Sequence, residues 1–234
     1  MEDWLSYRLS DLLLFSPRTY YRMFELYHQE LWPAQLLVLA LVVAIVVLLR
    51  RSDAWVDAAI AAFLAACWLW AGIAFHLQRY ATINWAARYF AAGFVMQAAL
   101  LLWSGVVRRQ VRFGSRRHTA GASAAVAFAA AVAISPLAGR ATERTWSQVE
   151  LMGLTPDATT LATLALLVTA TRASRWLVIV PLAWCLVGGA TLWALESPEA
   201  WVSIVAGVAG LVAMFRHSRR PRMDHVRQSP SMSS

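Results

Sequence analysis

The chain has 234 residues, of which 59% are hydrophobic and only 15% are charged, and its mean hydropathy is +0.52. A soluble domain carries roughly 25% charged residues, so this composition excludes an ordinary soluble fold and predicts an all-α, polytopic membrane helical bundle. The net charge is +8, and all 21 basic residues are arginine. The absence of lysine excludes chemistry that needs a lysine amine, such as a retinal or pyridoxal Schiff base.

Residues 1–31 form the first predicted domain, an N-terminal amphipathic helical segment. Ser16-Pro17 has the pattern of a helix N-cap followed by proline at the first helical position. Apolar residues then recur at three- and four-residue steps, which is typical of a helix that lies in the bilayer interface or packs on the bundle. Two interpretations stay open, a lipid-surface helix and a cap over a cavity. The segment has no signal-peptide pattern, so we expect the N-terminus to be retained.

Residues 32–216 form the second predicted domain, a transmembrane bundle of about seven helices. A transmembrane helix needs about 20 apolar residues. The apolar runs that meet or approach this length lie at about 33–49, 54–75, 85–107, 120–138, 156–171, 176–195 and 200–215. The fifth run is short for a bilayer at about 1.5 Å per residue, so whether residues 156–171 cross the membrane stays open. Residues 217–234 form the third predicted domain, a basic, disordered cytoplasmic tail.

The distribution of arginine predicts the orientation of the bundle. Most arginines lie in the connections after the first, third and fifth runs and in the tail, whereas the other three connections carry fewer. Cytoplasmic loops of membrane proteins are enriched in arginine. We therefore expect a multi-pass protein of the bacterial inner membrane with a cytoplasmic C-terminus and an external N-terminus.

The connection after the second run carries the first candidate site. His76 and Arg79 lie at the outer end of that run, and Asn84 and Arg88 lie one helical turn apart at the start of the next helix. An arginine held near the membrane boundary by Asn and His side chains could bind a small anionic solute or a lipid headgroup. The alternative is structural, in which Asn84 caps the helix and Arg88 extends to the interface.

The start of the short fifth run is the second candidate site. Glu150, Thr155 and Asp157 lie in a segment that is punctuated by glycine and proline and followed by several threonines. Such a segment can be a re-entrant element that lines a cavity, or an ordinary capped helix start. Both candidate sites and the N-terminal helices share the predicted outer side. This arrangement predicts one outward-facing, ligand-binding pocket centred on Arg88 and His76.

Catalytic, metal-binding and cofactor-binding motifs are missing from the sequence. Cys67 and Cys185 each lie inside an apolar run without metal-ligand spacing, so we expect two small core residues. None of the five histidines lies in the middle of a run, which argues against a bis-histidine haem. The middle of every run also lacks Asp and Glu, which weakens a proton- or sodium-coupled pump. We predict no cofactor, no metal, no catalytic residue and no nucleic-acid partner, and an enzyme is the least favoured class.

Three blocks of the sequence carry a resemblance to a known family. They are residues 9–21 (LSDLLLFSPRTYY), then Phe75-His76 with Ile83-Asn84 and Ala87, and residues 153–157 (GLTPD) with the threonines that follow. In these blocks the chain resembles an uncharacterised family of bacterial multi-pass membrane proteins, a permease-like domain of unknown function. The resemblance implies a membrane helical fold and a bacterial membrane location, but no activity. Ala158 stands where the family has a second proline, which puts a rigid double-proline turn in doubt.

Two function classes follow from these patterns. The first is a small permease or a solute- or lipid-binding membrane protein, whose site lies between the starts of the third and fifth runs under the N-terminal helices. The second is a non-catalytic membrane scaffold or accessory subunit, in which the same residues only pack and cap. Membrane lipids are the expected partners in either class, and a homo-oligomer or a membrane partner protein is compatible with both.

Overall fold

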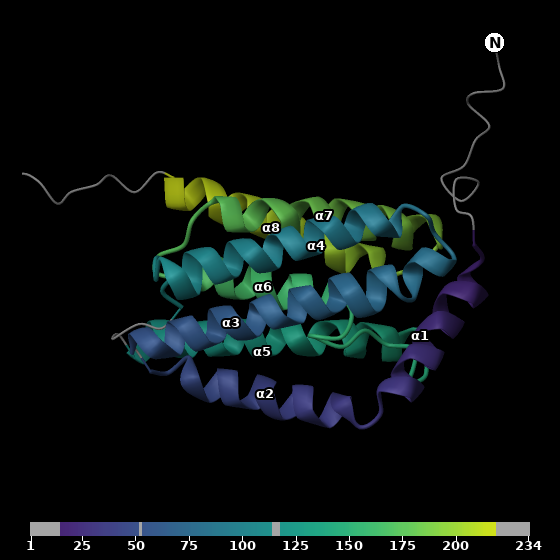
Figure 1. The fold of residues 1–234 in the computed structure, drawn as a ribbon, viewed down its shortest axis with the longest axis horizontal. Coiled ribbons are helices and arrows are strands. Elements are labelled where there is room, and N and C mark those ends of the chain that lie inside the picture. Colours follow the sequence, from purple (N-terminus) through teal and green to yellow (C-terminus); the bar gives the residue numbers. More distant parts are fainter. Residues whose placement is uncertain (1–14, 52, 114–117, 219–234) are drawn as a thin grey trace, which may run out of the picture.

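The structure is a computed structural model that describes residues 15–51, 53–113 and 118–218. The regular elements in these ranges are all helices, which confirms the predicted all-α fold. In Figure 1, α2 to α8 run side by side along the long axis and α1 crosses one end of them. The α-helices are α1 (Pro17–Leu31), α2 (Ala34–Leu48), α3 (Ala54–Trp70), α4 (Ala87–Leu101), α5 (His118–Ala141), α6 (Pro156–Thr169), α7 (Trp176–Ala194) and α8 (Ala200–Ser218).

The predicted N-cap and proline start of α1 are confirmed. The Ser16 side chain accepts a hydrogen bond from the Thr19 N–H at 3.2 Å, and Pro17 occupies the first turn. The buried face of α1 packs on the bundle end through an aromatic cluster that includes Phe75 and Tyr80. This face consists of Tyr20, Met23, Phe24, Tyr27 and His28. The helix predicted before Ser16 and most of the predicted tail lie outside the described residues.

α3 and α4 each continue into a wider π-helix at their C-terminal ends. α3 continues into a π-helix, η3 (Ala71–Leu77), and then a short 3₁₀ turn, η4 (Tyr80–Thr82), whereas α4 continues into a second π-helix, η5 (Leu102–Val107). Single π-turns inside helices are frequent at functional sites. Gly72 lets η3 approach α4 closely, because a Cβ atom there would lie 3.1 Å from the Phe94 Cβ. Phe75 and His76 in η3 are both buried.

The structure supports fewer membrane spans than the seven predicted. Within the described residues, four helices are long and apolar enough to cross a bilayer. The α1–α2 pair, which bends by 85°, would make a fifth if it forms one broken span. α6 and the apolar part of α8 fall short of this length. The four helices are Ala54–Thr82, Ala87–Val107, Gly121–Ala141 and Trp176–Ala194.

The burial of α6 explains why its apolar run was wrongly predicted to be a membrane span. α6 has 14 residues, and 11 of them are buried inside the bundle. At about 1.5 Å per residue it extends about 21 Å, against the roughly 30 Å of a bilayer core. A helix that is apolar on all sides is buried in protein or in lipid, and periodicity does not distinguish the two. The apolar surface of α6 therefore belongs to the protein core.

The arginine-rich connections gather at the end opposite α1 (Figure 1). There the backbones of Arg112 and Arg172 pair, with the Arg112 N–H donating to the Arg172 carbonyl at 2.8 Å. This bond joins the segment after η5 to the α6–α7 connection. The end covered by α1 holds the connection between α5 and α6 and the turn between α7 and α8, and both candidate sites lie at that end.

Candidate functional site

A carboxylate caps the N-terminus of α6. Thr155 has the backbone conformation of an N-cap, but its hydroxyl accepts the Leu151 N–H at 2.9 Å and makes no cap bond with the helix. The Glu150 carboxylate takes this role, because its Oε2 accepts the N–H groups of Asp157 and Ala158 at 2.9 and 3.1 Å. The first N–H groups of a helix lack partners within it and favour negative charge. A carboxyl group is therefore held at this position.

Asp157 places a second carboxyl group beside the first. Its Oδ1 accepts a hydrogen bond from the Trp184 indole N–H on α7, and its backbone N–H donates to the Glu150 carboxylate. Both side chains are buried, with 7% of each residue exposed. Neither forms a salt bridge with an Arg or His side chain in the described part of the chain. We call Glu150 and Asp157 the carboxyl pair.

Burial and the neighbouring carboxyl group favour a protonated form of the carboxyl pair. Two adjacent buried carboxylates disfavour each other's charge, so a proton on one of them relieves the repulsion. Burial raises the pKa of Glu150 well above its ordinary value, and the nearby charge of Asp157 raises it further. Two adjacent carboxylates titrate as a unit, so the proton belongs to the pair and not to one residue.

The carboxyl pair faces a small cavity between α5, α6, α7 and α8. Its volume is about 20 Å³, and a water-sized group needs roughly 10–15 Å³. We call this cavity the carboxyl chamber. Its polar lining consists of Ser135, Glu150, Asp157, Glu199 and Ser203.

Arg144 ties together three segments at the end of the chamber. Its guanidinium donates to the Glu199 carboxylate at 2.6 Å and to the Ser197 hydroxyl at 2.8 Å, and it also donates to the hydroxyl of Tyr21 on α1. The guanidinium carbon lies 3.8 Å from the centre of the Tyr21 ring. Glu199 also accepts the Thr142 hydroxyl at 3.0 Å. This Arg144 cluster holds α1 and the α5–α6 connection over the turn before α8.

The charge of Glu199 is compensated, unlike that of the carboxyl pair. The side chains of Arg144 and Glu199 are only 10% and 11% exposed. Burial raises the pKa of Glu199, while the Arg144 charge opposes that rise. The described residues around the chamber therefore include three buried carboxyl groups and one guanidinium. The guanidinium is paired with Glu199.

His76 lies behind the chamber, in an aromatic wall. Its side chain is fully buried, and within the described residues neither of its ring nitrogens has a hydrogen-bond partner. The ring centre lies 4.6 Å from that of Phe94 and 4.8 Å from that of Trp184. Trp184 in turn donates to Asp157. His76 is thus connected to the carboxyl pair through one indole ring.

The structure separates the other predicted site residues from the chamber. Arg79 forms an ion pair with Glu30 of α1. The Asn84 side chain accepts the Ala86 N–H at 3.0 Å in the turn before α4, whose N-cap is Ala86 and has no side-chain cap bond. Arg88 is exposed. Glu150, Thr155 and Asp157 do come together, whereas Arg88 does not join them, and a ligand-binding role for these residues remains a prediction.

Sequence patterns missed three residues that build the site. Trp184 lies inside an apolar run, where tryptophan also occurs as a membrane-facing residue. Arg144 and Glu199 lie in two different connections, and only the fold shows that they pair across 55 positions. The one available signal was that these connections are polar and share the predicted outer side.

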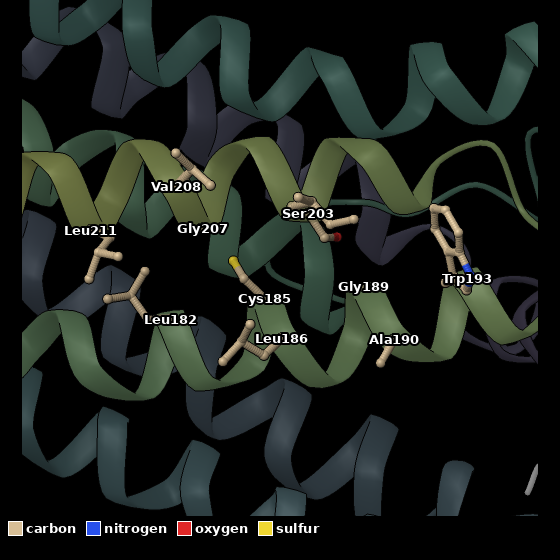
Figure 2. Close-up of a pocket in the computed structure, with 11 residues that line it drawn as sticks. Leu182, Cys185, Leu186, Gly189, Ala190, Trp193, Ser203, Gly207, Val208 and Leu211 are labelled. Atoms are coloured by element: carbon tan, nitrogen blue, oxygen red, sulfur yellow. The ribbon is translucent and has the colours of Figure 1, made fainter. Parts of the chain in front are cut away.

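A second cavity lies between α7 and α8 on the outer surface of the bundle. Its volume is about 410 Å³, and Figure 2 shows its lining, which is apolar apart from Ser203. Leu186 on its wall is 77% exposed, so the cavity is an open groove. Ser203 lines both this α7/α8 groove and the carboxyl chamber. Cys185, predicted as a small core residue, is buried and also contributes to the groove wall.

Gly188 offers a direct perturbation of the carboxyl pair. A Cβ atom at this position would lie 2.7 Å from the Asp157 Oδ1 and 3.3 Å from the Trp184 Nε1. We expect Gly188→Ala to displace the carboxyl group and to lower the free energy of unfolding by about 1–3 kcal/mol, because the Trp184–Asp157 hydrogen bond is lost. Denaturation and the indole N–H resonance of Trp184 measure the two effects.

Gly93→Ala is the matched control for Gly188→Ala. No atom lies within 4 Å of a Cβ atom built at position 93, and alanine favours a helix over glycine by about 1 kcal/mol. We expect this variant to be at least as stable as the parent chain. A loss of stability at Gly93 as large as that at Gly188 would show that the effect comes from helix substitution and not from the carboxyl pair.

The comparisons with known proteins identify a family but no activity. Groups of three or more His, Cys, Asp or Glu side chains that could hold a metal ion are absent from the described residues. No curated protein and no solved structure matches the chain. The model of DUF6064, a family of unknown function, matches residues 18–225. The match covers most of the sequence, and the chain therefore belongs to the DUF6064 family of unknown function.

Proposed function

We infer that the protein is a small integral membrane permease that binds a proton or a small monovalent cation in the carboxyl chamber. The observation that carries this inference is the carboxyl pair. Glu150 and Asp157 are buried together beside one cavity and have no salt bridge to a basic side chain within the described residues. Buried acidic groups in a membrane bundle are costly and frequently mark proton or ion pathways.

Membrane insertion is supported by the outer surface of the bundle. Four helices of membrane-spanning length and apolarity are present in the described residues. Large apolar side chains on several of them are exposed, among them Val107, Val126 and Leu186. An exposed apolar surface of this extent needs lipid or protein to cover it. The arginine-rich end opposite α1 supports a cytoplasmic location for that end and an external location for the chamber.

The chamber favours a cation over the anionic solute that the arginine residues suggested. An anion would meet the oxygen atoms of Glu150 and Asp157, which have no basic partner in the described residues. A proton or a monovalent cation relieves that repulsion. The chamber volume of about 20 Å³ also restricts the ligand to the size of a water molecule. An anion or headgroup site at Arg79 and Arg88 stays a separate prediction.

Proton movement in liposomes tests the proposed function. We expect purified protein in vesicles with an internal pH dye to move protons when a Na⁺ or K⁺ gradient is imposed. Glu150→Gln and Asp157→Asn should abolish this signal, because each removes one titratable group and keeps an oxygen acceptor. Asp53→Asn is the control, since Asp53 is 53% exposed at the far end of the bundle. A signal that survives both chamber variants would contradict the proposal, as would a parent chain no faster than empty vesicles.

A scaffold or accessory subunit is the second candidate function. It is favoured by the two backbone N–H groups that donate to Glu150. Capping a helix in this way is a structural role that accounts for the buried carboxylate without any transport. In this case Glu150→Gln and Asp157→Asn would change the folding stability and would have no effect on proton movement. Parent vesicles without any cation-dependent proton movement would then be the expected result.

A further inference from the structure

The α7/α8 groove and the carboxyl chamber are separated by a thin wall. Ser203 lines both cavities, and it packs against Gly189 of α7, where a Cβ atom would lie 3.5 Å from the Ser203 Cβ. Two small residues are thus the contact between the helices at this level. Figure 2 shows Ser203 between α8 and α7, beside Gly189. The lipid-facing groove and the buried acidic chamber are therefore adjacent compartments with a common residue.

The groove has the dimensions and chemistry of an alkyl-chain site. Its volume of about 410 Å³ is about twenty times that of the carboxyl chamber, which leaves room for a long alkyl chain. Along α7 it extends from Leu182 to Trp193, which corresponds to about 16 Å at about 1.5 Å per residue. Its lining side chains are hydrocarbon apart from the Ser203 hydroxyl, the Cys185 sulfur and the indole nitrogen of Trp193. A single extended alkyl tail matches this length, volume and polarity.

The chamber has the complementary chemistry of an ammonium site. Its carboxyl pair has no basic partner in the described part of the chain, and its volume of about 20 Å³ accommodates a group of the size of one water molecule. A primary ammonium has that size and donates three hydrogen bonds. A trimethylated ammonium is too large for this volume. An alcohol fits but brings no charge to the carboxyl pair.

We propose that the groove and the chamber form one site for a membrane amphiphile that has a single alkyl tail and a primary ammonium head. The tail lies in the α7/α8 groove, the head reaches the carboxyl pair, and Ser203 lies at the junction. The amphiphile enters from the bilayer between α7 and α8, where Gly189 and Ser203 leave the least side-chain volume to displace. This assignment of a substrate class rests on the proposed cation-binding function of the chamber.

Binding of hexadecylamine to the purified full-length chain tests the proposal. We expect hexadecylamine to bind at least about tenfold more tightly than hexadecanol or hexadecyltrimethylammonium, since one charge-assisted hydrogen bond exceeds a factor of ten in affinity. Glu150→Gln should remove this preference for the amine. Equal affinity for the amine and the alcohol in the parent chain would overturn the proposal.

A pair of alanine variants separates the groove from general membrane partitioning. Ala190→Phe fills the groove, whereas Ala92→Phe places the same ring on an exposed position of α4. We expect Ala190→Phe to weaken hexadecylamine binding about tenfold and Ala92→Phe to leave it unchanged. Equal binding by the two variants would overturn the groove assignment. An altered oligomeric state in Ala190→Phe with unchanged amine binding would also overturn it, because the groove would then be an interface between copies.

The outcomes for this proposal and for the proposed function are distinguishable. Loss of the preference for hexadecylamine, with cation-dependent proton movement intact in vesicles, would overturn the amphiphile site alone. Loss of both the amine preference and the proton movement would overturn both. We expect the parent chain to show both the amine preference and the proton movement. We expect Glu150→Gln to lose both.

Discussion

Glu150→Gln is expected to flatten the pH dependence of folding stability. The pKa of Glu150 in the folded chain is raised well above the ordinary value of 4.5. The folded state therefore binds more protons than the unfolded state at pH values above 4.5, and the free energy of unfolding falls as the pH rises. For one group this slope is at most about 1.4 kcal/mol per pH unit. Glutamine keeps an oxygen that accepts the Asp157 and Ala158 N–H groups, so the variant should fold with a flatter profile.

Denaturation of the detergent-solubilised chain between about pH 7 and pH 8, where an ordinary histidine is largely neutral, measures this slope. Glu196→Gln is the control, because Glu196 is exposed to solvent. Two results would count against the account. One is a parent chain whose stability is constant or rises over this range, and the other is an unchanged slope in Glu150→Gln.

Arg144→Met is expected to lower the free energy of unfolding by about 3–5 kcal/mol. The Arg144–Glu199 pair is about nine-tenths buried, and removal of one partner from such a pair leaves a buried charge without compensation. The variant also loses the hydrogen bonds from the guanidinium to Ser197 and Tyr21. Protonation of Glu199 limits the loss, so the effect should be smaller at low pH than at neutral pH.

The double variant Arg144→Met with Glu199→Met separates the two causes. Replacement of a complete buried pair by apolar side chains is often close to neutral, so we expect the double variant to recover much of the stability. Arg22→Met is the control, because the Arg22 side chain in its salt bridge with Glu25 is 57% exposed and such pairs contribute about 0–1 kcal/mol. A loss in Arg144→Met no larger than that in Arg22→Met would show that the Arg144 cluster does not hold the bundle end together.

Local features of the fold were predictable from the sequence, because short-range chemistry determines them. Ser16-Pro17 marked the start of α1, and the residues from Thr155 to Asp157 marked the start of α6. The number of membrane spans was not predictable in this way. The apolar residues of α6 are buried by other helices. An apolar run has the same sequence pattern whether protein or lipid surrounds it.

The carboxyl pair was partly predictable. Glu150 and Asp157 were candidates because a polar, glycine-containing segment precedes a short apolar helix. The absence of acidic residues from the middle of the runs nevertheless argued against a proton-coupled function. A connection can fold inward, however, and Glu150 is buried in this way at the N-terminus of α6. The Trp184 and Glu199 contacts depend on α7 and α8 packing against α6, which no local pattern encodes.

The central claim is that Glu150 and Asp157 together hold one proton inside the chamber. Infrared spectroscopy at neutral pH measures it most directly, because a protonated carboxylic acid has a carbonyl band distinct from that of a carboxylate. The account predicts a protonated-carboxyl band in the parent chain at neutral pH that is lost or shifted in both Glu150→Gln and Asp157→Asn. A parent spectrum without that band, or a band that persists unchanged in both variants, would contradict it.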